Sequence, residues 1–168
     1  DTYDLEPGHT AAEPKVRRIK EPHRVMSSVA DLVRHPVLLE LLTRLLGPGV
    51  RFQTSKLNMK SAGDGSAVEW HQDWAFYPHT NDDLLAVGVM LDDVDESNGP
   101  LCVLPGSHRG MIHDHHVDGR FCGAINPGND LIDFSAAVPL MGSAGSMTFH
   151  HVRAVHGSAP NRSARSRN

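Results

Sequence analysis

The sequence has 168 residues, a length that suits one domain built around a single core. Its formal net charge of -4 gives no reason to expect nucleic acid or an anionic membrane surface as a partner, and its longest apolar stretch, residues 37–46, is too short and too often interrupted by polar side chains to cross a membrane. Two cysteines, Cys102 and Cys122, are too few for a disulfide framework, so we expect reduced thiols and a cytoplasmic location.

The N-terminal part of the chain divides into a polar segment and a helical one. Residues 1–24 are polar and contain a basic run that is typical of a solvated face. Two serines at 27–28 can cap a first helix, and Pro36 suits the first turn of a second. Residues 25–46 are therefore expected to form two helical pieces, ended by Gly47, on the outside of a larger core.

From residue 50 onward the pattern changes to short strands separated by turns. Strands are expected in the segments 50–60, 84–91, 101–104 and 146–155. Between them lie segments rich in Gly, Pro, Asp and Asn, the longest of which is a loop at about residues 106–136. This pattern predicts a mainly β sandwich or open barrel with flanking N-terminal helices, as a single domain over residues 1–168 with its β-core at 50–168.

Histidine, the commonest metal ligand, occurs 12 times in this chain. His71 and Asp73 lie in an aromatic segment, residues 69–79. In an extended chain, residues i and i+2 point to the same side, so both side chains can reach one metal ion. With a second histidine from a distant strand they would form a triad of two histidines and one carboxylate. Such a triad leaves three positions of an octahedral ion open and suits Fe(II) that activates dioxygen.

The His-x-Asp spacing alone is not specific, because the chain contains it twice. His116 and Asp118 repeat it in a polar loop bounded by glycines. That setting predicts a solvated turn, or at most a weak adventitious metal site. The aromatic surroundings of His71 and Asp73, ahead of an expected buried strand, distinguish the first copy from the second.

Three histidines near the end of the sequence can supply the third ligand: His150, His151 and His156. The first two are adjacent, so only one of them can face inward from a strand. His156 is followed by the small residues Gly157 and Ser158 and then by three arginines. A guanidinium can hold a carboxylate through two parallel hydrogen bonds, so an arginine near an iron site suits a dicarboxylate co-substrate. Alternatively, the three arginines form a solvated basic tail.

Several motifs, taken in order along the chain, resemble those of one enzyme family. They are KLNMK at 56–60, WHQD at 70–73, NGPL at 98–101, PGSH at 105–108 and HGS at 156–158. Together with a downstream arginine, this combination resembles the phytanoyl-CoA dioxygenase family over almost the whole chain. The resemblance implies a double-stranded β-helix (a cupin-like jelly roll), with Fe(II) as the metal cofactor and 2-oxoglutarate as the co-substrate.

The resemblance also implies roles for individual residues. The implied metal ligands, which are also the catalytic residues, are His71, Asp73 and His156. Arg167, eleven residues after the distal histidine, matches the arginine that holds 2-oxoglutarate, with Arg165 and then Arg162 as the alternatives. Ser158 matches a hydroxyl that assists the same carboxylate. Further residues implied near the co-substrate are Asn58, Lys56 and Lys20. The candidates for substrate contact directly follow the first two ligands and are Trp74, Phe76, Tyr77 and His79; they could equally serve core packing.

The implied reaction is hydroxylation of an unactivated C–H bond of a small organic substrate by dioxygen, with release of succinate and CO2. Halogenating relatives carry a small residue in place of the metal-binding carboxylate, so Asp73 favours hydroxylation. Two alternatives stay open: a cupin-like metal-binding protein without 2-oxoglutarate turnover, and an inactive fragment of a hydroxylase. The sequence stops at Asn168, where the family continues its last strand, so we expect truncation at the ends. The sequence predicts neither the identity of the substrate nor the oligomeric state.

Overall fold

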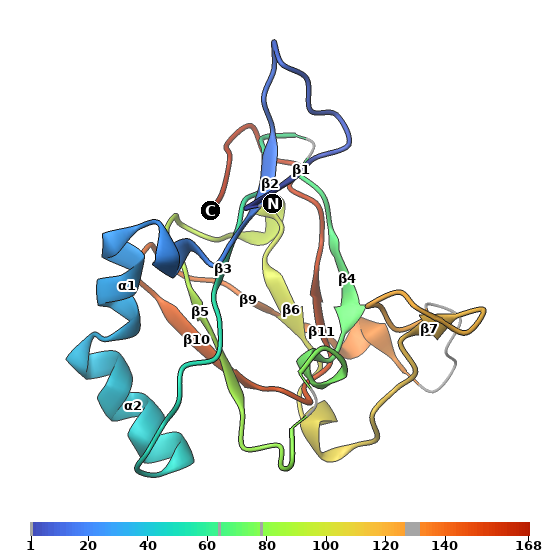
Figure 1. The fold of residues 1–168 in the computed structure, drawn as a ribbon. Helices are drawn as coiled ribbons and strands as arrows, with labels where there is room; N and C mark the ends of the chain where they lie inside the picture. Colours follow the sequence, from blue (N-terminus) through green and yellow to red (C-terminus); the bar gives the residue numbers. More distant parts are fainter. Residues whose placement is uncertain (1, 64, 78, 127–131) are drawn as a thin grey trace.

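The computed structural model describes residues 2–63, 65–77, 79–126 and 132–168 and is mainly β (Figure 1). Residues 127–131 of the predicted long loop therefore lie outside the described residues. In chain order, the strands and α-helices of the described part are β1 (Tyr3–Leu5), β2 (Val16–Lys20), α1 (Ser27–Val33), α2 (Pro36–Leu46), β3 (Lys56–Asn58), β4 (Val68–His71), β5 (Leu85–Val89), β6 (Leu101–Val103), β7 (His116–Val117), β8 (Arg120–Phe121), β9 (Val138–Leu140), β10 (Met147–His151) and β11 (His156–Ser158).

Two antiparallel sheets form the jelly roll. One has the strand order β4-β11-β6-β9, and the other pairs β10 with β5. Side chains from the two sheets meet in the space between them, since the ring centroids of His150 on β10 and His156 on β11 are 4.5 Å apart. Because β11 lies between β4 and β6, its inward side chains are surrounded by protein.

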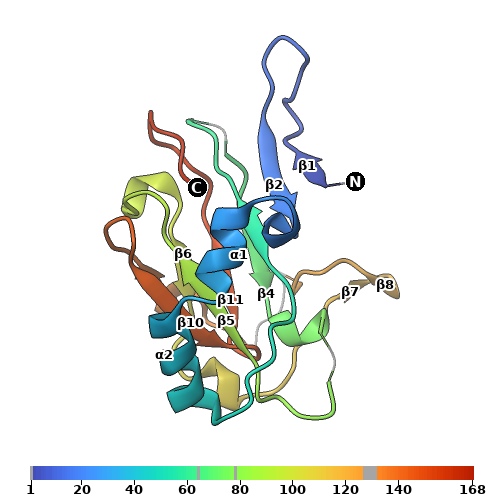
Figure 2. The ribbon, with the colours of Figure 1, turned by 60° about the vertical axis from the view of Figure 1, so that its left-hand side comes forward.

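The helices α1 and α2 flank the core beside the β5–β10 pair (Figures 1 and 2). Pro36 occupies the first turn of α2, where a missing amide hydrogen has no cost, and Gly47 ends the helix with a φ of 88°. Leu38 is buried, whereas most other residues of α2 are exposed. The prediction of two outer helical pieces is confirmed. Among the described residues, no helix has the length and apolar character needed to cross a membrane.

The predicted strands are observed, but they are shorter than expected. Segments 84–91 and 101–104 contain β5 and β6, segment 146–155 contains β10, and only the end of segment 50–60 forms β3. None of the four predicted segments contains β1, β2, β4, β9, β11 or the β7–β8 hairpin. These strands have only two to five residues, and β9 contains a proline, so local alternation is too weak to indicate them. Backbone pairing with another strand stabilises them instead, and for β2 and β9 that partner is distant in sequence.

A third sheet, with the order β1-β2-β3, is formed near the N-terminus. The basic run of the sequence lies mainly on β2. Arg18 and Lys20 both face Asp4 on β1, with nitrogen–oxygen distances of 3.6 and 2.9 Å. The basic run is thus partly neutralised by an acidic residue of the neighbouring strand.

A small apolar cluster lies on the far side of β4 and β11 from the interior space. Leu104, Ile125 and Val155 are buried together, and Trp70 packs against them. Successive side chains of a strand point to opposite faces. Since Trp70 faces this cluster, the next residue, His71, faces the space between the two sheets. The alternation of β4 therefore directs one candidate ligand inward.

Candidate functional site

Three buried side chains converge between the two sheets. His71 is the last residue of β4, His156 is the first residue of β11, and the two are partners across this strand pair. Asp73 begins the short 3-10 turn that follows β4. The atoms of these residues that could bind a metal all lie within 4.8 Å of one another. The structure thus brings together the three residues that the sequence analysis selected as metal ligands.

Hydrogen bonds to backbone carbonyls orient both imidazoles. Nδ1 of His71 is 2.7 Å from the carbonyl oxygen of Glu69, and Nδ1 of His156 is 2.9 Å from that of Ala154. A carbonyl oxygen only accepts, so Nδ1 carries the hydrogen in each ring and donates it. The two Nε2 atoms are 3.7 and 3.8 Å from oxygens of Asp73 and keep their lone pairs. This is the orientation that metal binding through Nε2 requires.

The protonation of the site also favours a cation. Burial lowers the pKa of His156 to about 3, and the neighbouring His71 acts in the same direction, so this imidazole is neutral at neutral pH. Burial by itself raises the pKa of Asp73, but the adjacent His150 and His71 outweigh it and hold that pKa below its usual range. Asp73 is therefore a carboxylate. A carboxylate beside a neutral imidazole is a donor set for a divalent transition metal.

Strand β10 adds a fourth polar side chain to the site. Nε2 of His150 is 3.7 Å from an oxygen of Asp73, and the side chain is 10% exposed. His151 points to the opposite face of the strand, where its ring lies 5.6 Å from that of His108. Of the three histidines proposed for the third ligand, the structure places His150 and His156 at the site and His151 outside it.

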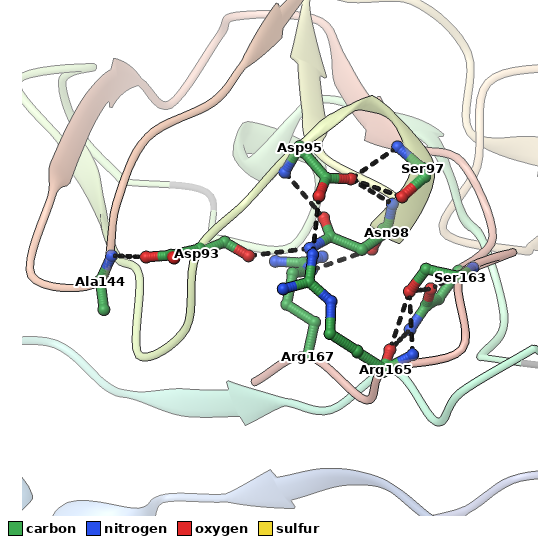
Figure 3. A network of polar contacts seen from close by, with 9 residues as sticks. Asp93, Asp95, Ser97, Asn98, Ala144, Ser163, Arg165 and Arg167 are labelled. Carbon is green, nitrogen blue, oxygen red and sulfur yellow. Dashed lines mark hydrogen bonds and ion pairs between the residues drawn. The ribbon is translucent and has the colours of Figure 1, made fainter.

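Arg165 and Arg167 belong to one polar network near the end of the chain (Figure 3). Arg165 is exposed, and its guanidinium forms an ion pair with Asp95 at 3.0 Å. The guanidinium of Arg167 is partly buried and donates hydrogen bonds of 3.1 and 2.8 Å to the carbonyls of residues 98–99. Its backbone pairs with Lys60 in both directions. The guanidinium of Arg167 is thus bonded to backbone carbonyls, whereas that of Arg165 is exposed and paired with a carboxylate.

Ser158, two residues after His156, has a buried hydroxyl with no hydrogen-bond partner in the part of the chain that the structure describes. A buried polar group of this kind is uncommon unless a ligand or water satisfies it. The unpartnered hydroxyl therefore indicates that a bound molecule places a polar group close to His156. Arg162, the third candidate arginine, is exposed, and its backbone amide bonds to the carbonyl of Ser97.

The other residues implied near the co-substrate lie on the N-terminal sheet and are exposed: Lys20, Lys56 and Asn58. Asn58 accepts a hydrogen bond of 3.0 Å from an arginine of β2, and Lys20 pairs with Asp4. Lys56 differs in its electrostatic effect. Burial raises the pKa of Asp73, but the nearby histidines lower it, and the positive charge of Lys56 lowers it further. Lys56 is therefore the member of this group that acts on the site electrostatically.

The aromatic residues predicted to contact substrate follow Asp73 closely: Trp74, Phe76, Tyr77 and His79. The ring of Phe76 packs edge-on against His71 at a centroid distance of 5.8 Å and is 41% exposed, so it covers one side of that imidazole. Burial and the carboxylate of Asp73 raise the pKa of Tyr77, which places its phenol within electrostatic reach of the site. Trp74 is partly buried, and His79 is exposed.

The sequence analysis did not select Gln72, which is wholly buried between two candidate ligands. Its side chain donates hydrogen bonds to the carbonyls of Met111 and Arg153 and accepts one from the amide of His113. Its backbone amide donates to Nε2 of His115 at 3.0 Å. Gln72 thus ties two distant segments to the backbone that carries the site, an arrangement that no local sequence pattern indicates.

The prediction of a solvated turn around the second His-x-Asp motif is only partly right. His116 and Asp118 are exposed, and His116 bonds to the exposed Asp114, as expected for such a turn. His115 is different, because it is 2% exposed and bonds to the backbone of Gln72. The prediction was wrong for this residue, since its burial accompanies a contact with Gln72, directly after β4, and does not follow from its polar neighbours.

Comparison with known proteins identifies relatives along nearly the whole chain. A probable alpha-ketoglutarate-dependent hypophosphite dioxygenase from Stutzerimonas stutzeri is 42% identical over 97% of this chain and 58% of its own length. An L-proline trans-4-hydroxylase from Streptomyces griseoviridis is 34% identical, covering 97% of this chain and 67% of the relative. An ectoine dioxygenase from Bordetella parapertussis is 33% identical, over 93% of this chain and 54% of its own length. The chain therefore spans little more than half the length of two of these relatives.

Solved structures agree with the fold. EctD from S. alaskensis, crystallised with 2-oxoglutarate and 5-hydroxyectoine, matches with a TM-score of 0.82 and 28% identity, over 99% of this chain and 57% of EctD. The same protein with bound Fe matches with a TM-score of 0.82 and 26% identity, over 99% of this chain and 58% of EctD. The predicted jelly-roll fold is thereby confirmed. The family model for phytanoyl-CoA dioxygenase (PhyH) matches residues 4–168, and the chain belongs to this family.

Proposed function

We propose that this chain carries the Fe(II)- and 2-oxoglutarate-binding core of a dioxygenase that hydroxylates a small substrate and releases succinate and CO2. The observation that carries the proposal is the arrangement of His71, Asp73 and His156, in which carbonyl bonds turn both Nε2 atoms toward one carboxylate. Two imidazoles and one carboxylate leave open positions for a chelating keto acid and dioxygen. The relatives, a probable alpha-ketoglutarate-dependent dioxygenase, a hydroxylase and a further dioxygenase, support the same reaction class.

The described residues fit an iron ion held by His71, Asp73 and His156. When bound, the iron activates dioxygen and drives the oxidative decarboxylation of 2-oxoglutarate. The protein provides the geometry: the carbonyls of Glu69 and Ala154 keep the two imidazoles in one tautomer and orientation. Because Asp73 is a carboxylate and not a small residue, hydroxylation is favoured over halogenation.

We assign the far carboxylate of 2-oxoglutarate to Arg167 and Ser158. The unpartnered hydroxyl of Ser158 and its place two residues after His156 support this assignment. Arg165 is a weaker candidate because its charge is already paired with Asp95 at the surface. In binding the carboxylate, Arg167 would exchange bonds to neutral backbone carbonyls for a pair in which both partners are charged, which is the stronger interaction.

The substrate is proposed to be a small polar molecule. The relatives' names mention hypophosphite, L-proline and ectoine, which are all small and charged at neutral pH. Phe76 and Tyr77 are the aromatic candidates whose positions beside His71 and Asp73 support contact with such a substrate. A cytoplasmic location and the lack of a nucleic-acid partner stay predictions from the composition.

An anaerobic titration of the intact protein with Fe(II) and then with 2-oxoglutarate tests this proposal. Keto-acid chelation of the iron should produce a visible charge-transfer band, whereas succinate, which has no keto group, should not. A folded, iron-loaded protein that shows no band with 2-oxoglutarate would contradict the proposal. Binding of zinc or nickel by such a protein would then favour the cupin-like metal-binding alternative.

A further inference from the structure

His150 is a buried imidazole without a hydrogen-bond partner. Its side chain is 10% exposed, and neither Nδ1 nor Nε2 is bonded to any other residue that the structure describes. An imidazole always carries at least one N–H donor, whichever tautomer it adopts. Burying that donor without a partner is unfavourable, so a bound molecule or water is expected to satisfy it.

The position of His150 directs it toward the candidate iron site. It lies on β10, in the sheet opposite the one that carries His71 and His156. Its Nε2 is 3.7 Å from Oδ2 of Asp73, and its ring centroid is 4.5 Å from that of His156. A molecule bound at the open face of the triad would therefore lie within reach of this imidazole.

One feature separates His150 from the ligand histidines. A metal-binding imidazole almost always donates its other N–H to a carbonyl or carboxylate, which fixes its tautomer. His71 and His156 both have such a bond through Nδ1. Nδ1 of His150 has none among the described residues. His150 also lies outside the group of three whose ligand atoms are mutually within 4.8 Å.

We propose that His150 is an oxyanion-binding residue, which donates a hydrogen bond to an anionic oxygen of a molecule bound beside the metal. The inference rests on the proposed function and adds a residue to it. Fe(II) carries two positive charges and its carboxylate ligand Asp73 carries one negative charge, so the loaded site retains a positive charge that favours an anion. Two molecules could present the oxygen: the keto-acid end of 2-oxoglutarate, or a substrate with a carboxylate or phosphorus oxyanion.

Two substitutions of His150 and one control test the inference in the intact, Fe(II)-loaded protein. His150→Phe fills a similar volume without an N–H, and His150→Gln retains a donor. His151→Phe is the matched control, because its side chain lies on the other face of the same strand. The binding of 2-oxoglutarate is measured anaerobically from the charge-transfer band. Binding of hypophosphite, L-proline and ectoine is measured from the change each produces in that band.

We expect His150→Phe to weaken binding of the oxyanion about tenfold or more, as befits loss of a hydrogen bond to a charged group. His150→Gln should recover part of the affinity, and His151→Phe should behave as the wild type. If only the affinity for 2-oxoglutarate falls, the co-substrate presents the anionic oxygen that His150 binds. If only the affinity for one of the other three compounds falls, the substrate presents that oxygen. Fe(II) affinity and the melting temperature should be unchanged in His150→Phe, because neither a metal bond nor a protein hydrogen bond is removed.

The inference is overturned if His150→Phe binds 2-oxoglutarate, and every other compound that binds the wild type, with wild-type affinity. It is also overturned if both His150 variants lose Fe(II) affinity, which would make His150 a metal ligand, or if His150→Phe lowers only the melting temperature. A wild-type protein without any charge-transfer band would refute the proposed function itself. That outcome is distinguishable, since it does not depend on the His150 variants.

Discussion

The backbone amide of Gln72 donates a hydrogen bond to Nε2 of His115 over a distance of 3.0 Å, although 43 positions separate the two residues. The ring is fixed from its other side as well, since Nδ1 donates to the carbonyl of His113 at 2.8 Å. Gln72 lies between two of the proposed metal ligands, His71 and Asp73. The buried His115 therefore supports the short piece of backbone that sets the spacing of these ligands.

Replacing His115 is expected to weaken iron binding without removing a ligand. In His115→Phe the amide of Gln72 loses its acceptor, so the backbone between the ligands is free to shift. Loss of such a supporting bond typically lowers metal affinity about tenfold to a hundredfold. Equilibrium titration with Fe(II) measures the effect, and His116→Ala, an exposed position in the same loop, is the control. Equal affinities in the two variants would show that the bond does not position the ligands.

Alanine at any of the three proposed ligand positions should abolish tight iron binding. His71→Ala and His156→Ala each remove one Nε2 donor, and Asp73→Ala removes the carboxylate between them. Fe(II) content after dialysis, measured by a colorimetric chelator, checks the outcome. His151→Ala is a suitable control because that side chain lies outside the site. Retention of wild-type iron affinity in His71→Ala would refute the assignment.

The two C-terminal arginines should differ in their effect on 2-oxoglutarate. Arg167→Ala is expected to raise the dissociation constant of 2-oxoglutarate about tenfold or more, because a charge-assisted bond to a carboxylate is lost. Arg165→Ala should change it little, since its guanidinium is exposed and paired with Asp95. Titration of the charge-transfer band gives both constants. The reverse ranking would assign the co-substrate to Arg165 instead.

Lys60 should make stability depend on pH in alkaline solution. Its amino group is buried and donates hydrogen bonds to the carbonyls of Ser66 and Ala159. Burial lowers its pKa from 10.5 to about 8, with further lowering from the positive charges of Arg167 and Arg17. Between these two values the unfolded chain binds the proton more strongly than the folded one, so this group's contribution to the free energy of unfolding rises with pH.

Denaturant unfolding of the wild type and of Lys60→Met at about pH 7 and about pH 10 measures this contribution. The stability difference, wild type minus variant, is expected to grow toward the higher pH. Other titrating groups, which the two proteins share, cancel in the difference. A difference that is constant between the two pH values would mean that Lys60 keeps its ordinary pKa in the folded protein.

The sequence indicated the fold class through local patterns. The leucines of residues 36–46 recur three and four positions apart, and Pro36 and Gly47 mark the two ends of this segment. This local pattern is sufficient to define α2, because helix formation depends on residues three and four apart. Strand β5 was likewise evident from its apolar run. Strands such as β2 and β9 could not be predicted, since they depend on backbone pairing with strands distant in sequence.

The amino-acid sequence by itself determined which residues could form the site: the His-x-Asp pair at 71–73 and the His-Gly-Ser motif at 156–158, in the order typical of one family. Among the C-terminal histidines, the family resemblance selected His156, but only the tertiary structure placed His150 beside His156 and turned His151 away. It also decided that His115 is buried while His116 is exposed. The physical reason is the same in each case. Which face of a strand is inward, and which loop residue finds a buried partner, depends on packing between segments far apart in the chain.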